Sequence, residues 1–245
     1  MLIQTTTFNA FFPKEQGMRR NFINIEDGLK DHFQTPLHLL PIPDDAPPDI
    51  PRAQTESHEG HSKLNISLDR LSLQTKYDHR FQSDWYKCKE YLENRIFPLI
   101  NLMKGYIDNN YSFSGLTTEI FIHDLDEEPV KHLFENFIKI GSNTNPFDVN
   151  LKLTYVLRER FYINISFSNV RLYEKTTNRE KELPAYLQQK DDVLSVLIDI
   201  NDRYAHNFQK DYHSDVDVMD EIFTITNDIL TGKLDQIIYE GRVEL

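Results

Sequence analysis

Hydrophobic and polar residues alternate in short stretches of the first hundred residues, and each stretch predicts a β-strand. In 5–12 one face of the predicted strand is apolar, formed by Phe8, Ala10 and Phe12. Two later stretches, 64–68 and 71–75, alternate in opposite phase. Because a continuous strand keeps one phase, the break at Asp69–Arg70 predicts a tight hairpin.

In the second half, 111–123 predicts a strand, and the stretches 149–157 and 161–167 alternate with the same parity. This pattern is typical of an antiparallel meander with one buried and one solvated face. The stretch 193–200 is apolar on both faces until Asp199, which predicts a central strand.

Apolar residues at three- and four-residue steps predict helices between these strands. A short helix is expected after Asn24 as its N-cap, with one apolar face formed by Ile25, Leu29 and Phe33. A long helix over 82–106 carries the stripe Trp85, Leu92, Ile96, Leu99 and Met103. Two more helices are predicted, from Pro129 to about Lys139 and after Asp217, where Gly232 is expected to interrupt or bend the second.

The order strand, helix, hairpin, helix therefore occurs twice, in 1–106 and in 107–245. We predict an α+β protein with predominantly antiparallel sheet and packing helices, built as one unit from two pseudo-repeated halves. Whether the halves share one sheet or form two lobes stays open at this point.

A proline-rich segment interrupts the first half. Six of the 11 prolines lie between Pro36 and Pro51, which rules out a helix or a central strand there. We expect an extended surface loop over 36–62, either covering the fold, disordered, or binding a partner.

Composition narrows the class of protein. The 245 residues include 16 Phe and 12 Tyr, which predicts an aromatic core, and the single cysteine, Cys88, excludes an intramolecular disulfide. We expect a cytoplasmic protein without a membrane segment or a secretion signal. The net charge of −12 opposes non-specific binding to nucleic acid or anionic lipid.

Three sets of residues could carry other chemistry. His123, Asp124, Asp199 and His206 could serve a metal-dependent hydrolase, since a strand-end His–Asp pair and further carboxylates suit a divalent metal. His58, His61 and His79 could in principle hold zinc, although their spacing also suits a polar loop. A basic hairpin over 158–181 could bind nucleic acid through Arg158, Arg160, Arg171, Lys175, Arg179 and Lys181.

Catalytic signatures are otherwise missing from the sequence. It contains no G-x-S-x-G elbow and no glycine-rich phosphate loop, and only eight glycines. No catalytic residue and no cofactor is predicted.

Four segments resemble a sporadically distributed, uncharacterised bacterial family of about this length: Leu64–Tyr77 leading to Trp85, Tyr111–Ile122 around Gly115-Leu116, Val196–Ile200, and Ile229–Ile238. The family usually follows the glycine-leucine pair with an arginine, an aromatic residue and an asparagine, where this chain has Thr117 to Ile120. The resemblance implies no catalytic residues. Scattered occurrence is similar to that of defence or toxin-associated genes.

The leading hypothesis is therefore a non-catalytic binding subunit that engages another protein through its sheet faces, sheet edges or the 36–51 loop, as an accessory component of a bacterial defence-type complex. The metal-dependent hydrolase and the nucleic-acid-binding protein are the alternatives. The partner and the oligomeric state stay open.

Overall fold

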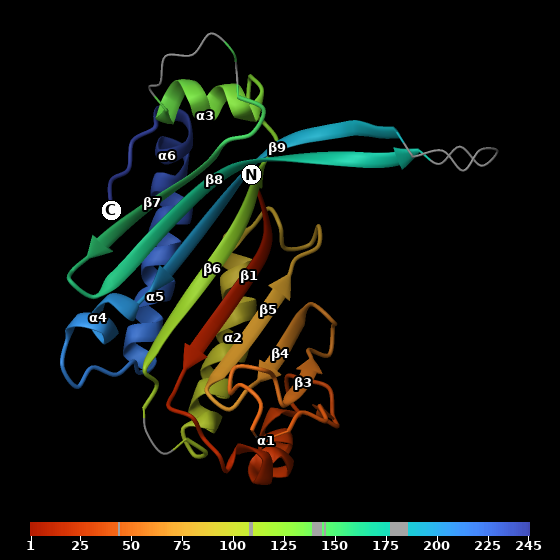
Figure 1. The fold of residues 1–245 in the computed structure, drawn as a ribbon, viewed down its shortest axis with the longest axis vertical. Coiled ribbons are helices and arrows are strands. Elements are labelled where there is room, and N and C mark those ends of the chain that lie inside the picture. Colours follow the sequence, from red (N-terminus) through yellow and green to blue (C-terminus); the bar gives the residue numbers. More distant parts are fainter. Residues whose placement is uncertain (44, 108–109, 139–143, 145, 177–185) are drawn as a thin grey trace.

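A single antiparallel sheet organises the chain in the computed structural model, which describes residues 1–245 except 44, 108–109, 139–143, 145 and 177–185 (Figure 1). The strand order is β2-β3-β4-β5-β1-β6-β9-β8-β7. The strands are β1 (Leu2–Phe11), β2 (His38–Leu39), β3 (Ala53–Glu56), β4 (Ser62–Ile66), β5 (Arg70–Lys76), β6 (Phe113–Ile122), β7 (Asn150–Leu157), β8 (Phe161–Thr176) and β9 (Tyr186–Asn201). The predicted α+β class with antiparallel pairing is confirmed.

Strands from both parts of the chain belong to this one sheet. β1 pairs with β5 on one side and with β6 on the other, so Phe8 lies between Leu73 and Leu116. The question left open by the sequence is answered, because no break separates two lobes of the sheet.

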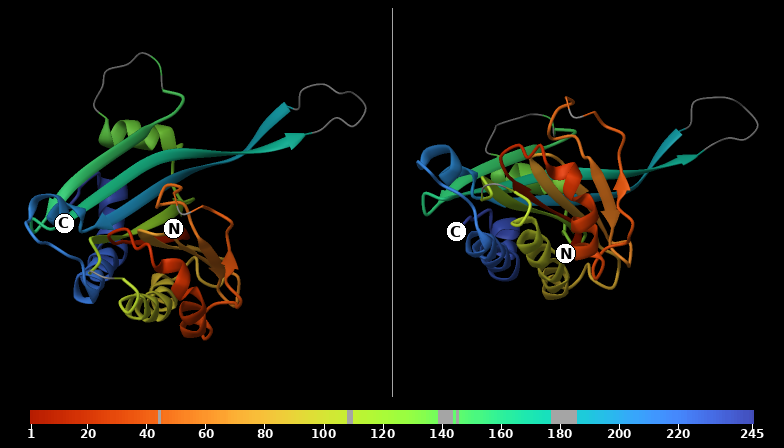
Figure 2. Two further views of the ribbon diagram at one scale, coloured as in Figure 1. Left: turned by 60° about the horizontal axis from the view of Figure 1, so that its bottom comes forward. Right: turned by 90° about the horizontal axis from the view of Figure 1, so that it is seen from below.

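Helices line one face of the sheet (Figure 2). They are α1 (Phe22–Leu29) after the short 3-10 helix η1 (Met18–Asn21), α2 (Trp85–Met103), and the helical rod made of α5 (Val216–Asp228), the π-helical turn η2 (Ile229–Lys233) and α6 (Leu234–Glu240). The helix α3 (Pro129–Phe137) lies at one end of the sheet, and the short α4 (Arg203–Phe208) lies at the opposite end of β8 and β9.

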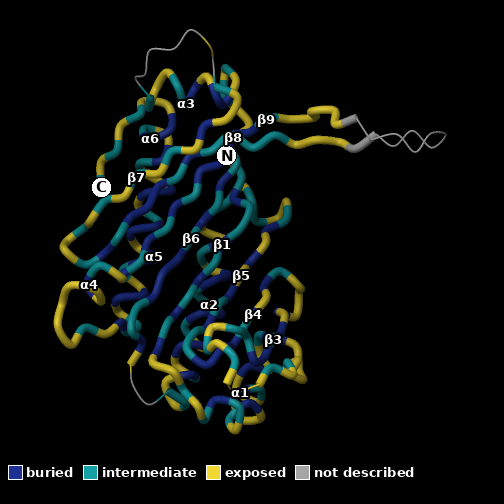
Figure 3. The backbone as a smooth tube through the Cα atoms, in the orientation of Figure 1, coloured by how far each residue is buried: buried dark blue, intermediate teal, exposed yellow. Residues whose placement is uncertain are grey.

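The core lies between the sheet and these helices (Figure 3). The predicted apolar faces are buried, including Phe8 and Ala10 on β1 and the whole stripe of α2: Trp85, Leu92, Ile96, Leu99 and Met103. Asp84 begins α2 by accepting hydrogen bonds from the backbone N–H groups of Tyr86 and Lys87. The cap therefore sets where α2 begins, and the buried stripe sets which side of it packs against the core.

The opposite face of the sheet is polar. Threonine, asparagine and serine side chains alternate with the buried residues, and one row crosses six neighbouring strands: Gln74, Thr7, Thr117, Asp199, Asn164 and Thr154. The alternation found in the sequence thus separates a helix-covered face from an open, hydrogen-bonding face.

The proline-rich segment is more ordered than the sequence suggested. It contributes the short strands β2 and β3 to the edge of the sheet. The buried side chain of Arg52 donates to the carbonyl oxygens of Ala46 (3.1 Å) and Pro47 (3.2 Å). A guanidinium group has five N–H donors, so it can satisfy several loop carbonyls at once. Sequence patterns could not reveal this tertiary role.

Other boundaries also differ from the predictions. The helix α1 begins at Phe22, so Asn24 lies inside it and is not its N-cap. The strand β9 begins at Tyr186 and not near Val193, a start that the sequence did not predict because residues 187–191 are exposed and show no apolar period. The interruption expected at Gly232 takes the form of the π-helical turn.

Gly115 marks a close approach between β6 and β9. A Cβ atom at this position would lie 2.8 Å from Cβ of Asn201 and 3.2 Å from the carbonyl oxygen of Ile200. We expect Gly115→Ala to destabilise the protein by about 1–3 kcal/mol, because strand backbones cannot move apart cheaply. Denaturant unfolding measures this change.

Gly232→Ala is the matched control, since a Cβ there meets nothing within 4 Å. In a helical segment alanine is favoured over glycine by about 1 kcal/mol, so this variant should be unchanged or more stable. Equal stability of the Gly115→Ala variant and the wild type would contradict the proposed crowding.

Candidate functional site

The strands β8 and β9 continue beyond the sheet as a two-stranded arm (Figure 1). β7 pairs with β8 only as far as Ser168, and β6 pairs with β9 only from Leu194 onward. Past these points β8 and β9 pair with each other alone, up to Thr176 and Tyr186. We call residues 170–176 and 186–193 the arm.

The arm exposes large apolar side chains. Leu172, Tyr173 and Leu187 are 43%, 45% and 66% exposed. The register places Tyr173 opposite Gln189 and Leu187 opposite Lys175, so Tyr173 and Leu187 share one face of the ribbon. Isolated two-stranded ribbons are at best marginally stable in water, and exposed strand edges readily pair with further chains.

The base of the arm is held by charges. The guanidinium of Arg171 lies 2.7 Å from Asp148 and 3.4 Å from Asp192, and it stacks 3.9 Å above the ring of Phe147. Burial raises the pKa of Asp192, and Arg171 partly offsets this effect. These contacts connect the base of the arm to the segment that precedes β7.

The sequence from 171 to 192 carries no net charge, unlike the rest of the chain. Residues 171–192 contain five Lys or Arg and five Asp or Glu residues, whereas the whole chain has a net charge of −12. A segment without net charge neither strongly attracts phosphate groups nor strongly repels an acidic surface.

The four residues of the hydrolase hypothesis lie at separate places. Asp199 lies opposite Thr117 on β6, while His123 follows the end of that strand, about 20 Å further along at the usual rise per residue. His123 forms an ion pair with Asp191 (3.5 Å), Asp124 lies 3.4 Å from the N-terminal amine of Met1, and His206 packs on the ring of Phe113.

Among the residues that the structure describes, no group of three His, Cys, Asp or Glu side chains could hold a metal ion. The geometry therefore gives the hydrolase hypothesis no assembled centre.

Asp199 is instead the hub of a hydrogen-bond network on the open face of the sheet. Its carboxylate accepts from Thr117 (3.2 Å), Asn164 (2.9 Å) and Asn201 (3.0 Å). Burial raises the pKa of Asp199, and the three donors partly offset that rise. The residue orders the side chains of three neighbouring strands.

The basic residues of the nucleic-acid hypothesis are also separated. Arg158 and Arg160, at the β7–β8 turn, both bind Glu221 of α5. Arg171 lies at the base of the arm, more than about 30 Å away along β8. The side chain of Lys175 and the residues Arg179 and Lys181 lie outside the described parts of the chain. The described arginines thus form no common basic patch.

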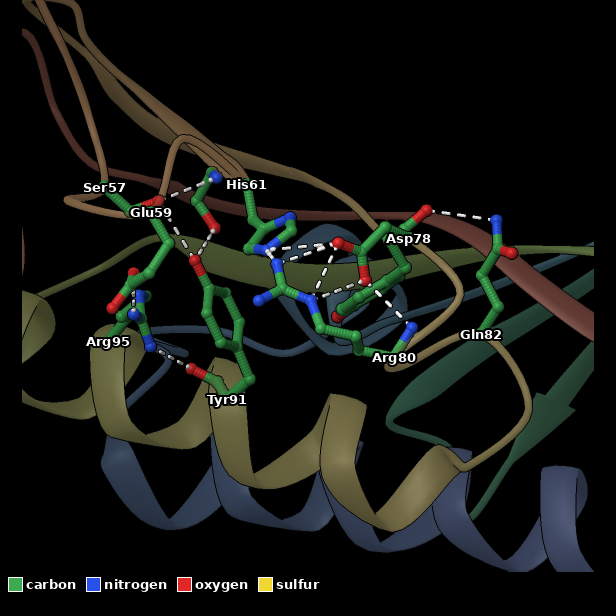
Figure 4. A network of polar contacts seen from close by, with 10 residues as sticks. Ser57, Glu59, His61, Asp78, Arg80, Gln82, Tyr91 and Arg95 are labelled. Atoms are coloured by element: carbon green, nitrogen blue, oxygen red, sulfur yellow. Dashed lines mark hydrogen bonds and ion pairs between the residues drawn. The ribbon is translucent and has the colours of Figure 1, made fainter.

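One of the three histidines considered for zinc, His61, belongs to a network of polar contacts (Figure 4). His61 contacts Arg80 (2.7 Å), which also binds Asp78 and lowers the pKa of that carboxyl to about 2. Nearby, Arg95 lies 3.5 Å above the ring of Tyr91 and 2.9 Å from Glu59. These contacts tie the β3–β4 and β5–α2 connections to α2. His58 contacts the carbonyl oxygen of Lys30 (2.9 Å).

Comparisons with protein-family models, with curated proteins and with solved structures found no match to this chain. None of the helices among the described residues combines the length and the apolar character needed to cross a bilayer.

The arm was missed by the analysis of the sequence. Its strands carry mostly polar residues on both faces, and their few apolar residues, among them Leu172, Tyr173 and Leu187, show no sustained alternation. Periodicity alone could not show that β6 and β7 stop short of the ends of β8 and β9.

A buried carboxylate directly after β9 predicts a pH effect. Asp202 accepts from the backbone N–H of Ser114 (2.6 Å) and from the hydroxyl of Tyr212 (2.8 Å), and burial raises its pKa above the usual 3.8. Between these two pKa values the folded state binds more protons than the unfolded state. Its contribution to stability is therefore present at low pH and is lost as pH rises.

We expect the stability advantage of the wild type over Asp202→Asn to shrink as pH rises from about 3 to about 7, by about 1.4 kcal/mol per unit of pKa difference. Urea unfolding of both proteins across this range measures the gap. A gap that widens with pH would show that the carboxylate is stabilised, and not penalised, by its site.

Proposed function

We propose that the chain is a non-catalytic subunit that binds another protein through the β8–β9 arm. The observation that carries this proposal is the arm itself, with exposed apolar side chains and two strand edges with which no other described strand pairs. A partner that supplies an extended segment would satisfy the free backbone groups and cover Tyr173 and Leu187.

The balanced charge of residues 171–192 supports a protein partner rather than a nucleic acid. Binding to phosphate backbones requires an excess of Lys and Arg, and here equal numbers of acidic residues oppose it. The wide polar face and the β7 edge are further surfaces for the same assembly, in line with the sheet faces and edges named from the sequence.

We also propose that the two halves are pseudo-repeats. In each half a first strand precedes a helix, then a meander whose last strand returns beside the first, and then a closing helix: β1, α1, β3–β5 and α2, against β6, α3, β7–β9 and α5. The sheet order places β5 beside β1 and β9 beside β6, so the halves meet at the two first strands. The arm and β2 are additions to this plan.

We propose the biological setting from the family resemblance and from the single cysteine. The resemblance to a sporadically distributed bacterial family supports an accessory role in a defence-type or toxin-associated complex. A single buried thiol, Cys88, whose pKa burial raises to about 12, supports a reducing compartment such as the cytoplasm.

Leu187→Glu tests the proposal. It places a charge in the exposed apolar face of the arm, and we expect at least a tenfold loss of partner capture from the native host. Quantitative pull-down with the purified chain as bait measures it. Ile23→Glu is the matched control, since Ile23 is 82% exposed on α1 and far from the arm.

Three outcomes would contradict the proposal. Partners could be retained equally by both variants, or light scattering could show that Leu187→Glu disrupts a dimer of the chain itself. Turnover of nucleic acid, nucleotide or peptide by the purified chain, abolished by Asp199→Asn or His123→Ala, would establish an enzyme instead.

A further inference from the structure

The strand β7 forms one edge of the sheet, and its outer side pairs with no other described strand. It pairs with β8 without a register shift, and its sequence contains no proline and a single charged residue, Lys152. Natural sheets protect exposed edges with short strands, prolines, bulges or charges, because a free edge readily pairs with another chain. Of these protections β7 has one charge alone.

The opposite edge of the same sheet is well protected. There β2 has only two residues, His38 and Leu39, and Pro36 and Pro41 stand on either side of them. Proline has no backbone N–H to donate to a neighbouring strand, and two residues offer few hydrogen bonds. The β7 edge, unlike the β2 edge, is therefore suited to pairing with a further strand.

The apolar side of β7 is only partly covered. Four of its side chains face the core and all four are half-buried: Leu151, Leu153, Tyr155 and Leu157. Their neighbours Ile163 and Ile165 on β8 are fully buried. On the open face Val156 is 47% exposed. A strand added beside β7 would cover this apolar row and satisfy the backbone groups of the edge.

The sequence of β7 restricts how two copies of the strand can pair. Opposite side chains of an antiparallel pair point to the same face, so a two-fold axis must pass through a residue and not between two residues. An axis at Lys152 would place two lysines opposite each other, and an axis at Tyr155 would place Lys152 opposite Arg158. Both arrangements bring like charges together, which is unfavourable.

An axis at Leu153 avoids these conflicts and uses the whole strand. Leu151 then lies opposite Tyr155 of the second copy, so the half-buried apolar rows of both copies meet. Lys152 lies opposite Thr154 of the second copy, and no lysine faces a basic residue.

Opposite charges meet at both ends of this pairing. Asp148 lies opposite Arg158 of the second copy, and the symmetry repeats the pair. Their side chains are 67% and 65% exposed, although Arg171 and Glu221 of the same chain already contact them. A carboxylate has about four acceptor positions and a guanidinium group five N–H donors, so each can bind a second partner.

From this self-complementary edge we propose that the chain forms a two-fold symmetric dimer by antiparallel β7–β7 pairing, with Leu153 on the axis. The two sheets become one continuous sheet, with the helices of both copies on the same face. The arm leaves the sheet at a different place and stays available to a partner protein, so the inference does not rest on the proposed function (Figure 1).

Cysteine cross-linking under mild oxidation tests the pairing and its register. Leu153→Cys places two thiols on the axis with Cα atoms about 5 Å apart, within the range of a disulfide, so we expect a cross-linked dimer on non-reducing gels. Thr154→Cys is the matched control, because its two Cα atoms would lie about 8 Å apart, too far for a disulfide. The native Cys88 is buried, so the wild type should not cross-link.

Two results of this experiment would overturn the proposal. One is the absence of a cross-link in Leu153→Cys while circular dichroism shows that the variant is folded. The other is cross-linking of Thr154→Cys to the same extent as Leu153→Cys.

Thr154→Lys and Thr154→Glu test the same pairing without a thiol. Thr154 is exposed and would lie opposite Lys152, and both variants lose the same hydrogen bond to Asn164. We expect a dimer dissociation constant about tenfold higher for Thr154→Lys than for Thr154→Glu, measured by sedimentation equilibrium. The net charge of −12 alone would give the opposite order, because added positive charge reduces repulsion between copies.

Leu187→Glu, in the arm, should leave the dimer unchanged. A wild-type chain that stays monomeric at about 100 μM, or equal dissociation constants for the two Thr154 variants, would overturn the proposal. Loss of the dimer in Leu187→Glu would show that the copies meet through the arm and not through β7.

Discussion

The pairing of β1 with β6 is the constraint on which the rest of the structure depends. These two strands, about a hundred residues apart in sequence, join at the middle of the sheet over most of their length. Their inward side chains, among them Phe8 and Leu116, form the floor of the core. Because side chains alternate between faces, a shift of one residue in this register would expose that whole apolar set.

The two faces of the sheet differ in character: one is apolar and covered by helices, and the other is polar. Its helix-covered face holds the large aromatic and aliphatic residues, and their removal from water supplies the main favourable term in folding. Its other face carries threonine, asparagine and the half-buried carboxylate of Asp199. Polar groups on this face bond to each other across strands, so a preorganised surface needs no dedicated loop.

Length differences between neighbouring strands create the arm. β8 and β9 have 16 residues each, whereas their outer neighbours β6 and β7 have ten and eight. The residues of β8 and β9 that extend past β6 and β7 pair only with each other and form the arm. Arg171, with Asp148, Asp192 and Phe147 around it, marks where the ribbon leaves the core.

The sequence by itself determined which segments become strands and helices wherever one face is buried, as with the stripe of α2 and the opposite phases of β4 and β5, because burial imposes a period on local sequence. Only the tertiary structure decided that both halves share one sheet, that Arg52 orders the proline-rich segment, and that Asp199 lies far from His123 but beside Asn164. These depend on contacts between residues distant in the chain, and neither spacing nor composition carries that information. The arm could not be predicted from the sequence, because neither of its faces is buried and its residues therefore show no hydrophobic period.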